Sequence, residues 1–434
     1  MIGERKCNLQ DTLQKNKSGV PVGLFSICSA NQYVIEAGMI EAFKNHSFVL
    51  IEATCNQVNQ FGGYTGMTPL DFRRYVESIA SKVGLDIDQV ILGGDHLGPY
   101  PWRNMPADIA MKNSEQMVMD YAIAGYRKIH LDASMHCADD DPAKPLSKVC
   151  AAQRAVRMCR VIESKFSNQT VAVKPVYVIG TEVPIPGGQQ DAEENIQITT
   201  IEDLDETISI HRNEFIKAGL ESAWDRVVAV VVQPGVEFNE NGIIEYDDKK
   251  SVNLKRYIKS IPGIVYEAHS TDYQTVDNLK KLVRDHFAIL KVGPALTYNF
   301  REALIGLIHI EEHLVAAGII DTRSNLLDTI KQVMSNNPKD WEDYLPKNQH
   351  LEIAKIFSYS DRIRYYWTDD DIRKSLGRLL KNLTRATIPL PMIKQYFPCQ
   401  YWLIRDGLLK NTPEDIILNH IGEVITMYSQ ACNQ

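Results

Sequence analysis

The chain has 434 residues, of which 44% are hydrophobic and 24% are charged, and its formal net charge is −8. This composition is typical of a folded globular protein and excludes a mainly disordered chain. The acidic balance argues against nucleic acid or an anionic membrane surface as a partner, and no apolar run reaches the roughly 18 residues of a membrane span. Because the N-terminal segment is polar and lacks a signal-peptide pattern, we expect a cytoplasmic protein.

Short apolar runs alternate with helical patterns along most of the chain. The first two runs, 22–29 and 48–54, enclose a segment with apolar residues at helical spacing, 32–44. Thr68 and Pro69 then have the residue types of an N-cap and a first helical position. Six more runs continue the alternation, at 89–92, 128–132, 175–180, 227–233, 263–268 and 287–292.

Eight such runs are the number that a (β/α)8 TIM barrel requires, and we predict an α/β fold of this class. The alternative is a doubly wound open sheet, which usually has fewer parallel strands. The chain also lacks a G-x-G-x-x-G turn after its first strand, so we expect no nucleotide cofactor.

Beyond Thr297 only helical patterns follow, beginning with an apolar helix at 300–317. We therefore divide the chain into a barrel at 1–300 and a helical C-terminal region at 301–434, packed on the barrel. The boundary shifts if the helix at 300–317 is instead the eighth helix of the barrel.

The stretch Ile91-Leu-Gly-Gly-Asp-His-Leu-Gly-Pro99 ends an apolar run in two glycines, a carboxylate and an imidazole. Residues just past the carboxyl ends of barrel strands face one common site. Most of the predicted strands end in a group that can bind a metal, move a proton or donate a hydrogen bond. We therefore predict a functional site at this rim, with a polar network or a remnant site as the alternative.

Within this site, His96 and His269 are the expected nitrogen ligands of a Zn²⁺ or Mn²⁺ ion, and Glu182 or Glu267 is the expected oxygen ligand. The metal would act as a Lewis acid on a substrate carbonyl. Asp95 and Asp132 are the candidate proton-transferring carboxylates, and Glu182 is a further catalytic candidate.

Basic and hydroxyl groups near the same rim predict an anion site. Lys291 is expected to bind an anion or pair with a glutamate rather than form a Schiff base. Ser270 and Thr297 lie after the seventh and eighth runs, where barrels usually hold phosphate. Arg362 and Arg364 could clamp an anion; alternatively, the aromatic residues around them dock the helical region while the arginines pair with acids.

Long motifs resemble one known family over nearly the whole chain. They include Ile51-Glu-Ala-Thr54, Gln60-Phe-Gly-Gly-Tyr-Thr-Gly-Met-Thr-Pro69, Gly93-Gly-Asp-His-Leu-Gly-Pro99 and Lys128-Ile-His-Leu-Asp132, and others at 178–184, 232–238, 266–275, 290–297 and 360–367. These resemble the GatZ/KbaZ family, the Z subunits of bacterial tagatose-1,6-bisphosphate aldolase. The resemblance implies a class II aldolase-like barrel.

The resemblance implies an accessory subunit that supports the activity and stability of a separate catalytic class II aldolase subunit, in galactitol or N-acetylgalactosamine catabolism. The alternative is a metal-dependent ketose-phosphate 4-epimerase or aldolase active on its own. Either way we expect a sugar-phosphate ligand, no nucleic acid or membrane partner, and we leave a homo-oligomer open. The catalytic aldolase subunits carry a further metal histidine, whereas the nearest counterpart here, Gln233-Pro-Gly235, has none.

Overall fold

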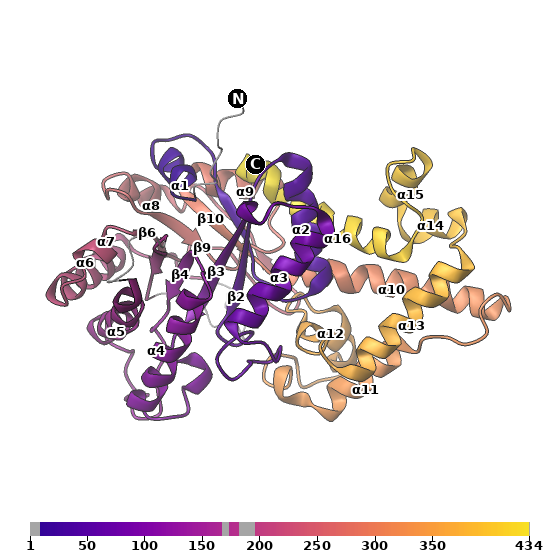
Figure 1. Cartoon of the computed structure of the whole chain (residues 1–434), viewed down its shortest axis with the longest axis horizontal. Coiled ribbons are helices and arrows are strands. Elements are labelled where there is room, and N and C mark those ends of the chain that lie inside the picture. The colour runs from indigo at the N-terminus through magenta and orange to yellow at the C-terminus, as the bar shows by residue number, and fades with distance from the viewer. Residues whose placement is uncertain (1–8, 167–172, 182–195, 434) are drawn as a thin grey trace.

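The computed structural model describes residues 9–166, 173–181 and 196–433, and its centre is a closed barrel of eight strands (Figure 1). Neighbouring strands are parallel, in the order β1-β10-β9-β6-β5-β4-β3-β2. Each predicted apolar run supplies one strand, so the predicted TIM barrel is confirmed. The strands are β1 (Leu24–Ile27), β2 (Val49–Thr54), β3 (Val90–Leu97), β4 (Lys128–Leu131), β5 (Val176–Ile179), β6 (Val227–Val231), β9 (Val265–Ala268) and β10 (Phe287–Val292).

Helices alternate with the strands and surround the barrel. They are α2 (Gln32–Asn45), α3 (Pro69–Val83), α4 (Ala107–Ile123), α5 (Lys148–Phe166), α6 (Ile201–Lys217), α7 (Glu221–Trp224), α8 (Val252–Ile258) and α9 (Val276–Arg284). The predicted start of α3 is confirmed: the Thr68 hydroxyl accepts from the Asp71 amide in a capping box, and Pro69 is the first helical residue. A small hairpin of β7 (Glu237–Phe238) and β8 (Ile243–Ile244) follows β6 and was not predicted.

The short helix α1 (Leu9–Lys17) closes the amino-terminal end of the barrel. Its Leu9 and Leu13 are buried in one apolar cluster with inward-facing residues of the strands, such as Leu50 and Ile289. The amide of the buried Asn16 donates to the carbonyl oxygens of Val22 and Val283, both at 2.8 Å. Side chains therefore fill this end of the barrel.

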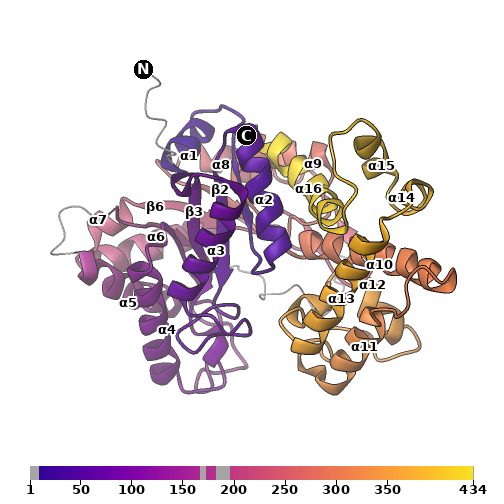
Figure 2. The ribbon, with the colours of Figure 1, turned by 45° about the vertical axis from the view of Figure 1, so that its right-hand side comes forward.

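The C-terminal region is helical, as predicted, and its last helix returns to the barrel (Figure 2). It contains α10 (Pro294–Ala316), α11 (Leu326–Asn336), α12 (Leu351–Phe357), α13 (Asp370–Ala386), α14 (Leu390–Tyr396), α15 (Pro398–Arg405) and α16 (Pro413–Cys432). Helix α16 packs against α2, α9 and β1, while α10 lies against α16. Helix α16 therefore takes the place of an eighth barrel helix, and the proposed division of the chain near residue 300 stays a prediction.

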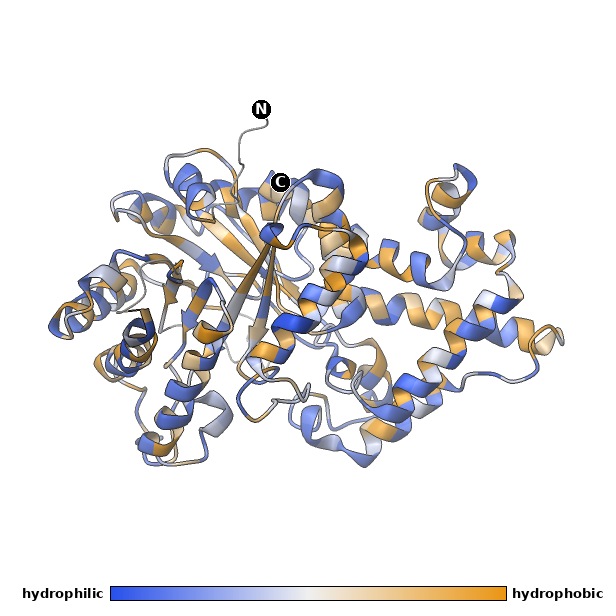
Figure 3. Cartoon of the chain, in the orientation of Figure 1, coloured by the Kyte–Doolittle hydropathy of each residue, from blue (hydrophilic) through white to orange (hydrophobic). Residues whose placement is uncertain are grey.

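Hydropathy follows this arrangement (Figure 3): the barrel strands are mainly hydrophobic, and the surrounding helices alternate between hydrophobic and hydrophilic residues. Helices that cover a sheet on one side and face water on the other show this alternation. Among the described residues, no helix combines the length and apolar character needed to cross a bilayer.

Candidate functional site

Glycines in β3 make room for the buried side chains of the barrel mouth. A Cβ on Gly93 would lie 2.6 Å from Oε1 of Glu52, so only a glycine leaves the Glu52 carboxylate its place inside the barrel. A Cβ on Gly98 would lie 1.5 Å from the carbonyl oxygen of Asp132. Between them, His96 has a φ of 48°, a left-handed conformation that a side chain rarely adopts outside functional or tightly constrained positions.

Two lysines and two glutamates form a fully enclosed ion-pair group inside the barrel. Nζ of Lys128 lies 2.6 Å from Oε1 of Glu52 and 2.7 Å from Oε2 of Glu267. Lys291 pairs with Oε2 of Glu52 and lies 2.8 Å from Oδ1 of Asp95. Because buried charges are costly unless paired, these contacts hold each carboxylate in one position.

Three imidazole rings meet beside this group. The ring centres of His96 and His269 are 4.8 Å apart, and that of His130 lies 5.3 Å from His96 and 5.4 Å from His269. Each ring has a nitrogen beside a carboxylate: Nδ1 of His96 is 2.9 Å from Asp132, Nδ1 of His130 is 3.1 Å from Asp95, and Nε2 of His269 is 3.0 Å from Glu267. Carboxylates so placed orient imidazoles that bind metals.

The charges of the group favour ionised carboxylates. Burial alone would raise the pKa of Asp95, but the imidazoles of His96, His130 and His269 outweigh it and hold that pKa below its ordinary value. Burial would likewise raise the pKa of Glu267, which Lys128 and the hydrogen bond from His269 lower to about 2. Burial lowers the pKa of Lys291 to about 8 although Cys28 acts in the opposite direction, and its Nζ is paired with Glu52 and Asp95.

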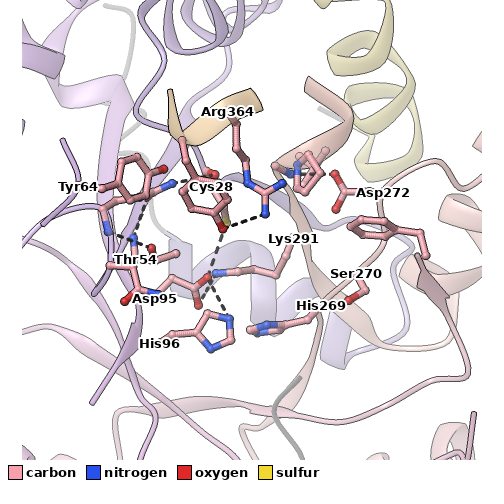
Figure 4. A pocket seen from close by; sticks show the side chains of 17 residues that line it. Cys28, Thr54, Tyr64, Asp95, His96, His269, Ser270, Asp272, Lys291 and Arg364 are labelled. Carbon is pink, nitrogen blue, oxygen red and sulfur yellow. Dashed lines mark hydrogen bonds and ion pairs between the residues drawn. The ribbon is translucent and has the colours of Figure 1, made fainter. Parts of the chain in front are cut away.

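A cavity opens above these groups (Figure 4). Its empty space is about 690 Å³, counting the part open to solvent. Asp95, His96, His269 and Lys291 line its floor, and Arg364 enters from the opposite edge. The cavity therefore brings together a buried carboxylate, imidazoles and two cationic groups.

Comparison with known proteins agrees with this architecture. Residues 9–433 match the family described as D-tagatose-1,6-bisphosphate aldolase subunit GatZ/KbaZ-like. The chain belongs to the GatZ/KbaZ-like family. A crystal structure described as a probable tagatose 6 phosphate kinase from Sinorhizobium meliloti 1021 is 42% identical, with a TM-score of 0.86, over 94% of this chain and 100% of that one.

Two aldolase structures were also found, at TM-scores below one half. The YdjI aldolase from Escherichia coli K12 is 10% identical, with a TM-score of 0.42, over 87% of this chain and 99% of that one. A fructose-bisphosphate aldolase from Campylobacter jejuni is 14% identical, also with a TM-score of 0.42, over 87% and 92%.

The structure of this GatZ/KbaZ-like chain brings most of the predicted site residues together. Asp95, His96, His269, Ser270, Lys291 and Arg364 line one cavity. Asp132 lies behind His96 and is bonded to its ring, so its place suits orientation of that imidazole rather than contact with a substrate. Glu182, the remaining predicted ligand and catalytic residue, lies outside the described residues.

Two predicted phosphate ligands lie away from the lining of this cavity. The buried Thr297 hydroxyl donates to the carbonyl of Pro294 at 3.2 Å. Arg362 stacks on Tyr344 at 3.7 Å and donates to the backbone carbonyl of Asp340, so both of these contacts lie within the helical region. Their anion-binding role stays a prediction.

The amino-terminal turn of α10 is held by a carboxylate of the chain itself. Asp272 accepts from the amides of Gly293 and Ala295, at 3.0 and 2.8 Å. Burial raises the pKa of Asp272 to about 6 despite these two bonds. A phosphate at this turn would face the Asp272 carboxylate, so the hydroxyl of Ser270 and the guanidinium of Arg364 are better placed to receive an anion.

Sequence reasoning did not assign roles to Lys128 or His130. The alternation of a strand was the available signal, because residues two apart point to the same face. Lys128, His130 and Asp132 follow this spacing, and all three are buried beside the site. Tyr64 and Tyr365, which also line the cavity, carry no such signal because they lie outside the barrel strands.

The donor set fits a divalent cation. Ligand atoms of Asp95, His130, Glu267 and His269 all lie within 4.8 Å of one another. Nε2 of the fully buried His130 has no hydrogen-bond partner within the part of the chain that the structure describes. Buried polar atoms are nearly always paired, so a metal ion is a fitting partner for this nitrogen.

Replacing Gly98 with alanine is expected to disturb the site through the backbone. The new Cβ would overlap the carbonyl of Asp132, so β3 and β4 must move apart. We expect the free energy of unfolding, measured by urea denaturation, to fall by about 1–3 kcal/mol. Gly377 in α13 is the control: nothing lies within 4 Å of a Cβ there, and alanine should stabilise the helix by about 0.5–1 kcal/mol. Equal effects of both changes would contradict this account.

Proposed function

We propose that the chain acts on a ketose phosphate at its own barrel mouth, as a metal-dependent ketose-phosphate 4-epimerase or aldolase. The observation that carries this proposal is the set of buried carboxylates, imidazoles and ammonium groups beneath the cavity. A chain that only supports a partner gains nothing from enclosing so many charges, because each must be desolvated and paired. Because the cavity lies directly above these groups, a small molecule bound in it would contact them.

The residues have separate tasks in this proposal. His130, His269 and Glu267 would hold Zn²⁺ or Mn²⁺, with His96 and Glu182 as the further ligands expected from the sequence. The bound ion would act as a Lewis acid on the ketose carbonyl. Asp95 would take the proton from the substrate hydroxyl beside the bond that breaks. Arg364 and Ser270 would bind the phosphate, and Lys291 would hold Asp95 in place.

Metal analysis followed by an activity assay tests this proposal. We expect the purified chain to contain a divalent metal and to convert fructose 6-phosphate or tagatose 1,6-bisphosphate when Zn²⁺ or Mn²⁺ is supplied. His269→Ala should lose both metal and activity, whereas His309→Ala, at a half-exposed histidine of α10, should keep both. A metal-free chain that is inert towards both sugars would refute it.

The second candidate is an accessory subunit of a class II tagatose-1,6-bisphosphate aldolase. It is favoured by the family description, which names a subunit of that enzyme. In this role the chain would raise the activity and stability of a catalytic subunit, in the cytoplasm, in galactitol or N-acetylgalactosamine catabolism. Co-expression with a class II aldolase chain should then raise that chain's activity and half-life. No gain in either quantity would eliminate this candidate.

A further inference from the structure

The helical C-terminal region supplies part of the cavity wall. The 3-10 turn η4 (Arg362–Tyr365) places Arg364 and Tyr365 in the lining, beside residues of the barrel strands. Directly before it, the buried Asp361 accepts from Nε of Arg301 in α10 at 2.9 Å. This buried ion pair fixes the turn to the helix that follows β10, so the two side chains are held in place.

Tyr365 lies beside two cationic groups. Its hydroxyl oxygen accepts from Nη2 of Arg364 at 3.1 Å. The guanidinium carbons of Arg362 and Arg364 each lie 4.6 Å from the centre of its ring. A hydrogen bond from a cation and a second nearby cation both stabilise a phenolate relative to a phenol.

The remaining groups around Tyr365 do not cancel this effect. Burial and the Asp340 carboxylate would raise the pKa of Tyr365, but Arg364 and Arg362 outweigh them and bring it below the ordinary value. The ring also packs edge-on against Tyr64, at 5.0 Å between centres. Tyr64 lines the same cavity, yet burial raises its pKa, so only one of the two phenols is adapted to release a proton.

We propose that Tyr365 is the second acid–base group of the reaction. It acts from the wall of the cavity, which the helical region supplies, whereas Asp95 acts from the floor, at the end of β3. This inference rests on the proposed function and narrows it to 4-epimerisation. Cleavage by an aldolase takes the proton of the C4 hydroxyl and must then put a proton on C3 of the enolate. Inversion at C4 leaves C3 unprotonated, because the C3–C4 bond forms again, and it needs instead a proton donor beside the other face of the aldehyde, where the C4 hydroxyl is re-formed.

The proposed step balances without an oxidant or reductant. Asp95 takes the proton of the C4 hydroxyl, the C3–C4 bond breaks, and its electron pair moves to the C2 carbonyl to give an enolate and an aldehyde. The aldehyde turns so that its other face meets C3. The C3–C4 bond forms again, the C2 carbonyl is restored, and the new C4 alkoxide takes a proton from Tyr365. Exchange with water returns the proton from Asp95 to the phenolate.

The test compares Tyr365→Phe with Tyr344→Phe in the full-length, metal-supplied chain. Both substitutions remove one phenolic hydroxyl from a ring that stacks with Arg362, but Tyr344 is not among the residues that line the cavity. We expect Tyr365→Phe to lower kcat for C4 inversion by about 100-fold or more with KM nearly unchanged. Tyr344→Phe should behave as the unchanged chain.

Two pH measurements supply a second line of evidence. Because Tyr365 donates its proton, kcat should fall as pH rises through its lowered pKa, and Arg364→Gln should move this fall to higher pH. Near-ultraviolet absorbance followed against pH should show one tyrosinate that forms at lower pH than the others. This tyrosinate should be missing in Tyr365→Phe, whether or not the chain is active.

The outcomes separate this inference from the proposed function. An active chain in which Tyr365→Phe keeps kcat within about threefold would overturn the role of Tyr365 and leave the proposed function standing. A chain that cleaves a ketose bisphosphate but never inverts C4 would also overturn it. A chain inert towards every ketose phosphate supplied would remove the proposed function, and this inference with it.

Discussion

Replacing Asp95 with asparagine is expected to lower kcat of the proposed reaction by about 10²–10⁴-fold. The amide keeps the shape of the side chain but cannot take the hydroxyl proton. Its surroundings support the ionised form, since Lys291 lies 2.8 Å from Oδ1 and Nδ1 of His130 lies 3.1 Å from it. Initial rates with fructose 6-phosphate, at saturating substrate and supplied metal, measure this loss.

Asp108→Asn is the matched control. Asp108 lies in the first turn of α4, its side chain is 89% exposed, and its nearest cation is 3.6 Å away. Its substitution should leave kcat unchanged. A barrel that only binds sugar phosphate would lose nothing with Asp95→Asn, so equal rates for the two variants would contradict a catalytic role.

Sequence patterns predicted the barrel because its strands are short, apolar and bounded by turns. Helix α1 was not predicted, because Leu9 and Leu13 are its only buried apolar residues and the segment is otherwise polar. The place of α16 could not be predicted either. Its Tyr428 hydroxyl donates to the carbonyl of Thr271 at 2.7 Å, a contact between residues more than 150 positions apart that no local periodicity encodes.

Some residues of the candidate site could likewise be predicted from the sequence, and others could not. Asp95, His96 and His269 were predicted because they end strands, and parallel strands bring their ends to one rim. Tyr365 reaches the cavity from a turn far along the chain, and only the tertiary structure shows that its hydroxyl meets Arg364 inside the barrel mouth. Sequence alone therefore indicates the floor of the site better than its wall.

Lys128 is the residue on which the floor depends most. Its side chain is fully buried, and its one positive charge forms ion pairs with the carboxylates of both Glu52 and Glu267. Those carboxylates in turn contact Lys291 and His269. Without the lysine, two negative charges would remain enclosed with less compensation, and one glutamate would have to take up a proton.

Lys128→Met, which keeps most of the length of the side chain but removes its charge, is therefore expected to lower the free energy of unfolding by about 3–5 kcal/mol in urea denaturation. Lys374→Met is the control, because Lys374 is 76% exposed and its pair with Asp371 should contribute at most about 0.5 kcal/mol. Adding Glu267→Gln to Lys128→Met should cost less than the sum of the two single changes, since the second change removes a charge that the first left unpaired. Additive losses, or a Lys128 variant as stable as the Lys374 variant, would show that the enclosed ion pairs do not hold the floor of the site together.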